Sequence, residues 1–354
     1  MSQFWSSIAK RVDPYTPGEQ PKDQKYVKLN TNENPYPPSP KVLEVLKAQC
    51  DELLRLYPDP DAALLKDALA KHFGVERQNV FVGNSSDEVL ALSFMAFFVQ
   101  DKPLLFPDIT YSFYDVYCKL YGIDYKRIPL SEDLSVTIDD YACDNGGIVF
   151  PNPNAPTGRA LSLADIERLL QKNTQTVVLV DEAYVDFGGE SAIALVNKYP
   201  NVLVVQTFSK SRSLAGLRVG FAIGSAELIE GLERIKNSFN SYPLDRLSIA
   251  GGVMALEDEE YFESICQKII TTREQAVKQF EAMGFSVIPS AANFLFVRHK
   301  TAAAEKLYLE LKAKGVLVRY FNKPRIDNYL RVTIGTDEEM NALFDCLTQC
   351  LNEA

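Results

Sequence analysis

The hydrophobic positions change their spacing along the chain. From about residue 41 apolar residues recur at helical intervals (Val42, Leu43, Val45 and Leu46), and a second such set follows 57–60 at 64, 65 and 69, which predicts two helices. Further on, short and nearly continuous apolar runs alternate with helical patterns; the runs lie at 80–82, 104–106, 147–150, 177–180 and 202–206. Strands that are apolar on both faces belong in a buried sheet. The alternation therefore predicts an α/β fold whose mostly parallel sheet, of the seven-stranded type, is flanked by helices.

The two ends of the chain follow other patterns. Residues 1–40 are rich in proline, asparagine and charge, which is typical of an irregular arm. Near the other end a long helix is predicted over about 256–283, then strands at 294–297, 316–318 and 330–333, with a helix between the first two and another at the end. We therefore expect an N-terminal arm (1–40), a large domain (41–255) and a smaller α+β domain (256–354), with the arm packing on the small domain and the site.

Polar residues follow directly after most of the apolar runs in the middle of the chain. They are Asn84 to Asp87, Asn152 and Asn154, Asp181, and Ser209 with Lys210. In a parallel sheet, ligands bind outside the carboxyl ends of the strands. Several polar strand ends in series therefore predict one shared binding site.

Composition excludes several classes of protein. The net charge is −10, which argues against nucleic acid or an anionic membrane as partner. There are only two histidines, and the six cysteines form no C-x-x-C pair, so no metal site is expected. The longest apolar run, 89–99, is shorter than the roughly 20 residues of a membrane span, and the N-terminus has no apolar signal core. We expect a soluble, cytoplasmic protein.

Three of the polar clusters indicate chemistry, although each also has a purely structural explanation. The stretch 83–88 between a strand and a helix could cradle an anion or could be an ordinary helix cap. Asp181 ends a buried strand, where a carboxylate needs either a cationic ligand or a salt bridge; Tyr184 would lie on the same side. Lys210 is either a partly desolvated amine that acts as nucleophile or base, or a lysine that reaches solvent.

Arg218 adds a second cation eight residues after Lys210, in a glycine-containing loop, and arginine suits phosphate. The ligand implied by all these groups carries a phosphate, a protonated ring nitrogen and an aldehyde that reacts with an amine. Pyridoxal 5′-phosphate has these parts.

With these residues in view, the chain resembles the fold-type-I pyridoxal-phosphate-dependent aminotransferases of the class II group, and among them the histidinol-phosphate aminotransferases. The resemblance runs from end to end. Its most specific parts are Asp181-Glu182-Ala183-Tyr184 and Ser209-Lys210 followed by Gly216-Leu217-Arg218-Val219-Gly220. Other matching stretches lie at 29–35, 57–59, 83–88, 110–112, 153–158 and 330–335.

The resemblance implies a role for each matching residue. Lys210 would form the Schiff base and move the proton, Asp181 would keep the ring nitrogen protonated, and Tyr184 would bond to the ring 3-hydroxyl. Tyr111 would stack on the ring, unless it is simply a core aromatic. Further contacts to the cofactor, mainly to its phosphate, are expected from Ser85, Ser86, Asp87, Thr207, Ser209 and Arg218. Tyr57 would reach the phosphate of a neighbouring subunit, which implies a homodimer with shared active sites.

One position departs from the family pattern. The second asparagine of the usual Pro-Asn-Asn-Pro motif, which normally contacts the ring 3-hydroxyl, is Ala155 here. We predict that Asn154 takes over this contact; the alternative is that Tyr184 makes it alone.

On the substrate side, Arg331 matches the arginine that holds the substrate carboxylate. Arg319 matches a second anion-binding arginine, although a surface ion pair is an equal alternative. Tyr15 and Asn32 match substrate-side positions in the arm, which would also exclude water from the site.

The resemblance implies a transaminase that transfers the amino group of L-histidinol phosphate to 2-oxoglutarate in histidine biosynthesis, giving imidazole-acetol phosphate and glutamate. Three alternatives stay open on the sequence. An aromatic amino acid aminotransferase differs in not accommodating a phosphate. A related decarboxylase would hold a carboxylate perpendicular to the ring. A non-catalytic cofactor-binding regulator is disfavoured because residues 1–28 are too few for a DNA-binding module.

Overall fold

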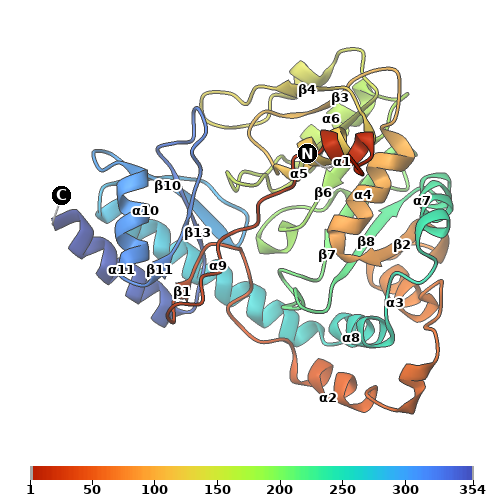
Figure 1. Cartoon of the computed structure of the whole chain (residues 1–354), viewed down its shortest axis with the longest axis horizontal. Coiled ribbons are helices and arrows are strands. Elements are labelled where there is room, and N and C mark those ends of the chain that lie inside the picture. Colours follow the sequence, from red (N-terminus) through yellow and green to blue (C-terminus); the bar gives the residue numbers. More distant parts are fainter. Residues whose placement is uncertain (1–2, 353–354) are drawn as a thin grey trace.

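The larger of the sheets in the computed structural model, which describes residues 3–352, has seven strands in the order β2–β8–β7–β6–β5–β3–β4 (Figure 1). Only β8 runs antiparallel to its neighbours. The mostly parallel seven-stranded sheet predicted from the hydrophobic pattern is thus confirmed. Its strands are β2 (Val80–Asn84), β3 (Leu104–Pro107), β4 (Tyr125–Ile128), β5 (Gly147–Pro151), β6 (Val178–Asp181), β7 (Val202–Thr207) and β8 (Val219–Gly224).

Both faces of this sheet are covered because successive side chains of a strand point to opposite sides. In β6, Val178 and Val180 belong to one apolar cluster and Leu179 to another. The first cluster is completed by α2 (Pro40–Ala48), α3 (Ala63–Phe73), α6 (Leu163–Lys172) and α8 (Arg246–Glu257). The second is completed by α4 (Ser85–Phe97), α5 (Phe113–Tyr121) and α7 (Ala226–Phe239). Each fully buried Val or Leu stabilises this sandwich by about 1.5–3 kcal/mol.

A second sheet of four strands, in the order β12–β13–β10–β9, is formed by the C-terminal part of the chain. Its strands are β9 (Phe285–Ile288), β10 (Phe294–His299), β12 (Arg319–Tyr320) and β13 (Leu330–Thr333). One face packs on α9 (Glu259–Ala282), α10 (Ala304–Ala313) and α11 (Asp337–Asn352). The α+β pattern expected for this region is therefore present.

Two predicted elements have different bounds in the structure. The helix predicted over 256–283 begins at Glu259, because α8 ends at Glu257 and Asp258 leaves the helical conformation. The Asp258 carboxylate accepts hydrogen bonds from Ser39 and Lys41 of the arm side. The strand predicted at 316–318 is β11 (Val316–Leu317), which pairs with β1 (Val27–Lys28); β12, which was not predicted, follows after Val318 and joins the four-stranded sheet.

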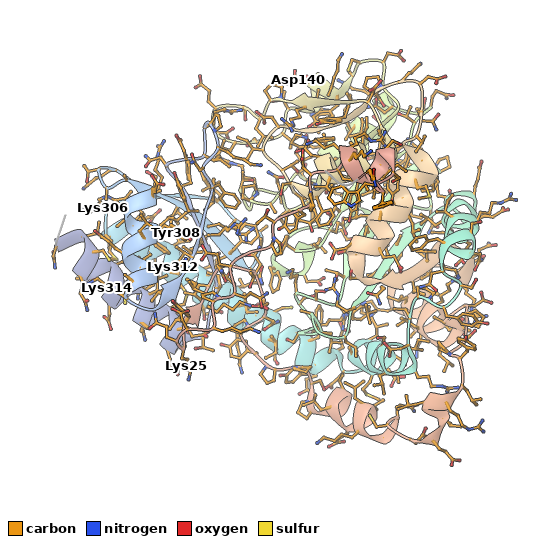
Figure 2. All side chains as sticks on the ribbon, viewed as in Figure 1. Lys25, Asp140, Lys306, Tyr308, Lys312 and Lys314 are labelled. Atoms are coloured by element: carbon orange, nitrogen blue, oxygen red, sulfur yellow. The ribbon has the colours of Figure 1, made fainter. Side chains whose placement is uncertain are left out.

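The N-terminal arm touches both halves of the molecule. It begins with α1 (Ser7–Arg11), and Asp13 forms an ion pair with Lys119 of α5 at 2.6 Å. Further along, the Glu19 carboxylate accepts hydrogen bonds from Tyr308 and Lys312 of α10, which Figure 2 labels. The arm therefore crosses from the large sheet to the small one before β1 (Figure 1).

The remaining regular elements are short 3-10 helices at η1 (Glu52–Arg55), η2 (Arg77–Asn79), η3 (Ile138–Tyr141), η4 (Val185–Phe187) and η5 (Ala192–Leu195). Within residues 3–352, no helix has the length and apolar character needed to cross a membrane.

Candidate active site

A cavity of about 280 Å³ lies between the edge of the large sheet, the small sheet and the arm. Most of the residues predicted from the sequence line it together. They are Tyr15, Asn32, Ser86, Asp87, Tyr111, Asp181, Tyr184, Thr207, Ser209, Lys210, Arg218, Arg319 and Arg331. The structure thus brings together residues that are up to about 316 positions apart in sequence. The polar residues after β2, β6 and β7 meet as the series of polar strand ends predicted, whereas Asn152 and Asn154 after β5 do not line the cavity.

Strand direction explains why these groups meet. Asp181 is the last residue of β6 and Thr207 the last of β7, and these two strands run parallel. Arg218 directly precedes β8, which is antiparallel to β7. The start of β8 therefore lies at the same edge of the sheet as the carboxyl ends of its neighbours.

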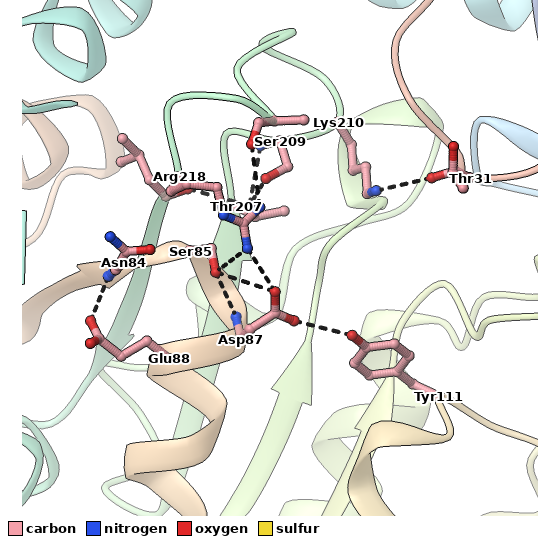
Figure 3. A network of polar contacts seen from close by, with 12 residues as sticks. Thr31, Asn84, Ser85, Asp87, Glu88, Tyr111, Thr207, Ser209, Lys210 and Arg218 are labelled. Carbon is pink, nitrogen blue, oxygen red and sulfur yellow. Dashed lines mark hydrogen bonds and ion pairs between the residues drawn. The ribbon is translucent and has the colours of Figure 1, made fainter. Parts of the chain in front are cut away.

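The beginning of α4 forms an anion-binding corner (Figure 3). Arg218 donates from Nη2 to Ser85 Oγ at 2.7 Å and to Asp87 Oδ2 at 2.8 Å. Ser85 has a positive φ of 67° and its amide donates to the Arg218 carbonyl at 2.9 Å. The same turn also carries capping bonds, because the Asp87 amide donates to Ser85 Oγ at 3.3 Å and the Asn84 amide donates to Glu88 Oε2 at 2.6 Å, so the cap and the anion-binding explanations apply to the same residues. A guanidinium group at the positive end of a helix dipole is suited to phosphate.

Gly220 permits this close approach of strand and helix. A Cβ atom at this position would lie 2.2 Å from the Ser85 carbonyl carbon and 2.3 Å from the Ser86 amide nitrogen. Any side chain there would push β8 away from the first turn of α4 and displace Arg218 from Ser85. The glycine of the Arg-Val-Gly motif is therefore explained by packing.

Asp181 lacks a partner for one of its carboxylate oxygens. It is 4 % exposed, and its Oδ2 accepts a hydrogen bond from the Tyr114 hydroxyl at 2.8 Å. Oδ1 is buried and has no hydrogen-bond partner, and within the described residues Asp181 forms no ion pair. Burial raises the pKa of Asp181 to about 6. An unpaired buried carboxylate is costly, so a cationic ligand group in the cavity would stabilise it.

Tyr114 is a site residue that the sequence reasoning missed. Its ring is fully buried among the aromatic residues under the sheet, and burial raises the pKa of its hydroxyl well above the usual value. The hydroxyl therefore stays protonated and donates to Asp181. No sequence pattern distinguishes it, because it is one of 17 tyrosines and lies on a helix rather than at a strand end.

Tyr111 forms a wall of the cavity and contacts the anion-binding corner. Its hydroxyl donates to Asp87 Oδ1 at 3.1 Å, and burial raises its pKa. Its ring packs edge-on against Tyr114, with 5.7 Å between centroids, and lies 6.3 Å from the ring of Tyr15 in the arm. The ring is thereby held in one orientation beside Asp181 and Asp87, as a stacking surface requires.

Lys210 reaches into the cavity instead of extending to solvent (Figure 3). Its Nζ lies 3.5 Å from the Thr31 carbonyl oxygen and 5.9 Å from the Tyr184 ring centroid. The backbone of Lys210 is anchored by Asn34, whose Nδ2 donates to the Lys210 carbonyl at 2.8 Å. Asn32 Nδ2 in turn donates to the Tyr184 hydroxyl at 3.0 Å. The arm therefore positions both residues.

The two predicted anion-binding arginines lie side by side on adjacent strands of the small sheet. Arg319 of β12 and Arg331 of β13 are direct cross-strand partners. Leu330 and Val332 point to the helices, so the alternating pattern directs Arg331 to the cavity. Arg331 Nη2 donates to the Asn30 carbonyl at 3.0 Å, its Nε has no partner, and burial lowers its pKa.

Neither guanidinium forms an ion pair with a carboxylate in the described part of the chain, so the surface ion pair considered for Arg319 is absent. Like charges directly opposite each other in a sheet are destabilising. An anion bound between them would remove that repulsion, and guanidinium groups are suited to phosphate and carboxylate.

Three predicted residues lie outside the cavity lining. Ser85 acts behind it, through its bond to Arg218. Tyr57 is 78 % exposed and stacks on Tyr242, with ring centroids 4.7 Å apart. Asn154 is buried, and its Nδ2 donates to the Ile109 carbonyl and to Thr157 Oγ1. Ala155 lines the cavity instead. Only the Nδ2 of Asn154 is engaged, since its Oδ1 is buried without a hydrogen-bond partner; the contact of Asn154 with the cofactor, and the alternative through Tyr184, stay predictions.

Comparison with known proteins agrees with the resemblance seen in the sequence. The family described as aminotransferase class I and II matches residues 24–347. The chain is 61% identical over 351 residues to histidinol-phosphate aminotransferase 1 of Hydrogenovibrio crunogenus, covering 99% of each chain. It is 62% identical over 346 residues to the histidinol-phosphate aminotransferase of a Marinomonas species, covering 97% of this chain and 98% of the other.

Among solved structures, the chain is similar to histidinol-phosphate aminotransferase from Sinorhizobium meliloti in complex with pyridoxal 5′-phosphate. The TM-score is 0.86 at 23% identity, with 93% of this chain and 92% of that chain covered. At this identity the likeness concerns the fold.

Proposed function

This chain belongs to the class I and II aminotransferases, and we propose that it transfers the amino group of L-histidinol phosphate to 2-oxoglutarate, as a step of histidine biosynthesis. The cofactor of the family is pyridoxal 5′-phosphate, and it is the cofactor of this enzyme. The relatives that are 56–62% identical over nearly their full length all carry the name histidinol-phosphate aminotransferase, which supports the choice of amino donor.

The residues present fit this cofactor at both of its charged ends. The unpaired Oδ1 of Asp181 is an acceptor for a protonated ring nitrogen. The corner formed by Arg218, Ser85 and the start of α4 is suited to the phosphate. When bound, pyridoxal phosphate supplies an electron sink for the charge that develops at the substrate Cα.

The protein groups around that centre have distinct tasks. Lys210 Nζ would hold the aldehyde end of the cofactor and would move the proton at the substrate Cα. Asp181, fixed by Tyr114, would keep the ring nitrogen protonated, which the electron sink requires. Tyr111 and Tyr184 would orient the ring. The arm, through Tyr15 and Asn32, closes the cavity and excludes water.

The observation that carries the choice of substrate is the cross-strand pair of Arg319 and Arg331. Two guanidinium groups on one wall of the cavity can both bind the phosphate of histidinol phosphate. In the second half of the reaction, they can bind the two carboxylates of 2-oxoglutarate separately. An aromatic amino acid has one carboxylate and would leave one of these cations without a partner, so this alternative is not favoured.

Arg319→Gln tests this assignment in the first half-reaction, with the amino donor added to cofactor-loaded enzyme in the absence of acceptor. We expect kcat/KM for histidinol phosphate to fall about 10–100-fold, the range for losing a hydrogen bond to a charged group. The value for phenylalanine, which needs only Arg331, should change less than about threefold. Equal losses for both donors, measured by stopped-flow absorbance, would refute a phosphate-specific role of Arg319.

We also propose that the enzyme is a cytoplasmic homodimer. All six cysteines are unpaired, as expected in a reducing compartment. Large apolar side chains are exposed together around η1, α3 and the end of α7, which is unusual for a monomer's surface: Leu53, Leu54, Leu56, Tyr57, Leu64, Phe239 and Tyr242. A second copy of the chain would cover them and would receive Tyr57 at its cofactor phosphate.

Sedimentation equilibrium should give a mass near twice 39.7 kDa. Tyr57→Phe should weaken cofactor binding by about 10-fold without dissociating the dimer, since only one hydrogen bond to phosphate is lost. A monomeric protein, or unchanged cofactor affinity in the variant, would contradict the shared site.

A further inference from the structure

Both arginines of the anion site are carried at the base of one hairpin. Arg319 pairs with Arg331, the next pair is Tyr320 with Leu330, and residues 321–329 form the loop that joins β12 to β13. The loop is folded by successive turns, in which Lys323, Ile326 and Tyr329 donate backbone hydrogen bonds to residues two or three positions earlier. Because the loop joins the two strands directly, a displacement of the loop would shift the strands that carry the two arginines.

The loop is fastened to the large sheet by Arg325. Its Nη1 donates to Asp108 Oδ2 at 2.9 Å, and its Nη2 donates to the carbonyl oxygens of Leu130 and Ser131, each at 2.8 Å. The acceptors are themselves connected, because Asp108 Oδ1 accepts from the Leu130 amide at 2.9 Å. A planar guanidinium is suited to such a set of converging acceptors.

An apolar layer beneath Arg325 joins the same two parts. Ile326 is 2 % exposed and belongs to a cluster with Ile109, Leu130 and Leu134 of the large-sheet side. On the small-sheet side, Tyr329 stacks on Phe296, with centroids 4.5 Å apart and planes at 8°. The loop is thus docked through both polar and apolar contacts.

The backbone of Arg325 is strained in this docked state. Its φ is +71°, a left-handed conformation that is unfavourable for a residue with a side chain. Such conformations persist only where surrounding contacts impose them, and they concentrate at functional sites. The three hydrogen bonds of the guanidinium provide that constraint here.

On the large-sheet side, the acceptor Asp108 lies close in sequence to residues of the active site. Asp108 follows β3 and precedes Ile109, whose carbonyl accepts from Asn154, and then Thr110 and Tyr111, which line the cavity. Arg325 therefore ties the loop that carries Tyr111 to the hairpin that carries Arg319 and Arg331.

We propose that Arg325 is a positioning residue that fixes the distance between the arginine pair and the cofactor-binding edge, and so sets the affinity for anionic substrates. The proposal rests on the proposed function only in that substrates bind to this arginine pair. When Arg325 is lost, the hairpin spends only a fraction of time in the competent position, and apparent dissociation constants rise by the inverse of that fraction. Once substrate is bound the hairpin is in place, so kcat is largely retained.

The test compares Arg325→Ala and Arg325→Gly holoenzymes with the wild type. We expect KM for 2-oxoglutarate and the inhibition constant of inorganic phosphate each to rise about fivefold to tenfold, with kcat changed less than about twofold. The glycine variant separates contacts from strain, because glycine adopts a positive φ freely. It should weaken anion binding as much as alanine does while keeping the thermal midpoint of the wild type.

Arg127→Ala is the matched control, since Arg127 forms a similar, partly exposed pair with Asp115 at 2.8 Å within the large-sheet side. It should leave KM, phosphate inhibition and cofactor affinity unchanged. If the Arg325 variants behave like this control, or if their KM rises only in parallel with a fall in cofactor affinity and thermal midpoint, the positioning role is overturned. Because 2-oxoglutarate and phosphate are the probes, this result does not depend on which amino donor the enzyme prefers.

Discussion

Replacing Lys210 with alanine should abolish transamination. The variant loses both the amine proposed to hold the cofactor aldehyde and the base proposed to act at the substrate Cα, so we expect kcat to fall by at least about 10³-fold, given that general acid–base catalysis alone contributes 10²–10⁴-fold. The structure supports this expectation because Lys210 Nζ lies inside the cavity, 3.5 Å from the Thr31 carbonyl. Stopped-flow and steady-state assays of glutamate formation measure the loss.

The same variant should lose the visible absorbance that arises when the cofactor is bound to a lysine. Asp181 and Arg218 are unchanged, so the cofactor should still bind reversibly, which equilibrium dialysis would detect. Lys198→Ala serves as control, because Lys198 is an exposed lysine paired with Glu167. A Lys210→Ala enzyme with normal turnover would refute the assignment of the catalytic amine.

Asp181→Asn should lower kcat/KM by about 10²–10³-fold, the usual effect of removing one preorganised electrostatic group. Asparagine keeps the shape and the bond to Tyr114 but cannot hold a protonated ring nitrogen. Tyr114→Phe should have a smaller effect, about 10-fold, because the carboxylate remains and only its orientation is lost. An Asn variant with activity close to that of the wild type would contradict the role of Asp181.

The pH dependence of cofactor binding gives a second measurement on the same residue. Burial raises the pKa of Asp181 in the apoprotein to about 6, so its contribution to folding stability is present at low pH and is lost as pH rises from about 4 through 6. A protonated ring nitrogen bound beside Asp181 would stabilise the ionised carboxylate and so offset the cost of burying it. Cofactor affinity should therefore increase as pH rises through about 6 in the wild type, and this step should be absent in Asp181→Asn.

Much of the fold and the site followed from local sequence patterns. Buried parallel strands are apolar on both faces, so runs such as that of β6 were evident, and Asp181, Lys210 and Arg218 stood out because polar residues directly flank these runs. The cross-strand relation of Arg319 and Arg331 was not predictable, because it depends on the register of β12 and β13. That register requires the break between β11 and β12, which the continuous apolar run 316–318 conceals.

Other features depend on tertiary contacts that have no local signal. Tyr114 acts through a hydroxyl at the end of a buried aromatic side chain, and its helix position looks like any core position. The sequence also does not show that the Nδ2 of Asn154 donates to Ile109 and Thr157, or that Asn154 lies outside the cavity lining. Arg325 lies in an exposed loop, and its acceptors are about 190–220 residues away in sequence.

The amino donor preferred by the wild-type enzyme is the most direct measure of the proposed function. With saturating 2-oxoglutarate, kcat/KM should be determined side by side for L-histidinol phosphate and L-phenylalanine. Because the phosphate engages both Arg319 and Arg331, we expect the value for histidinol phosphate to be higher by at least about 10-fold. A higher value for phenylalanine would contradict the assignment of histidinol phosphate as substrate.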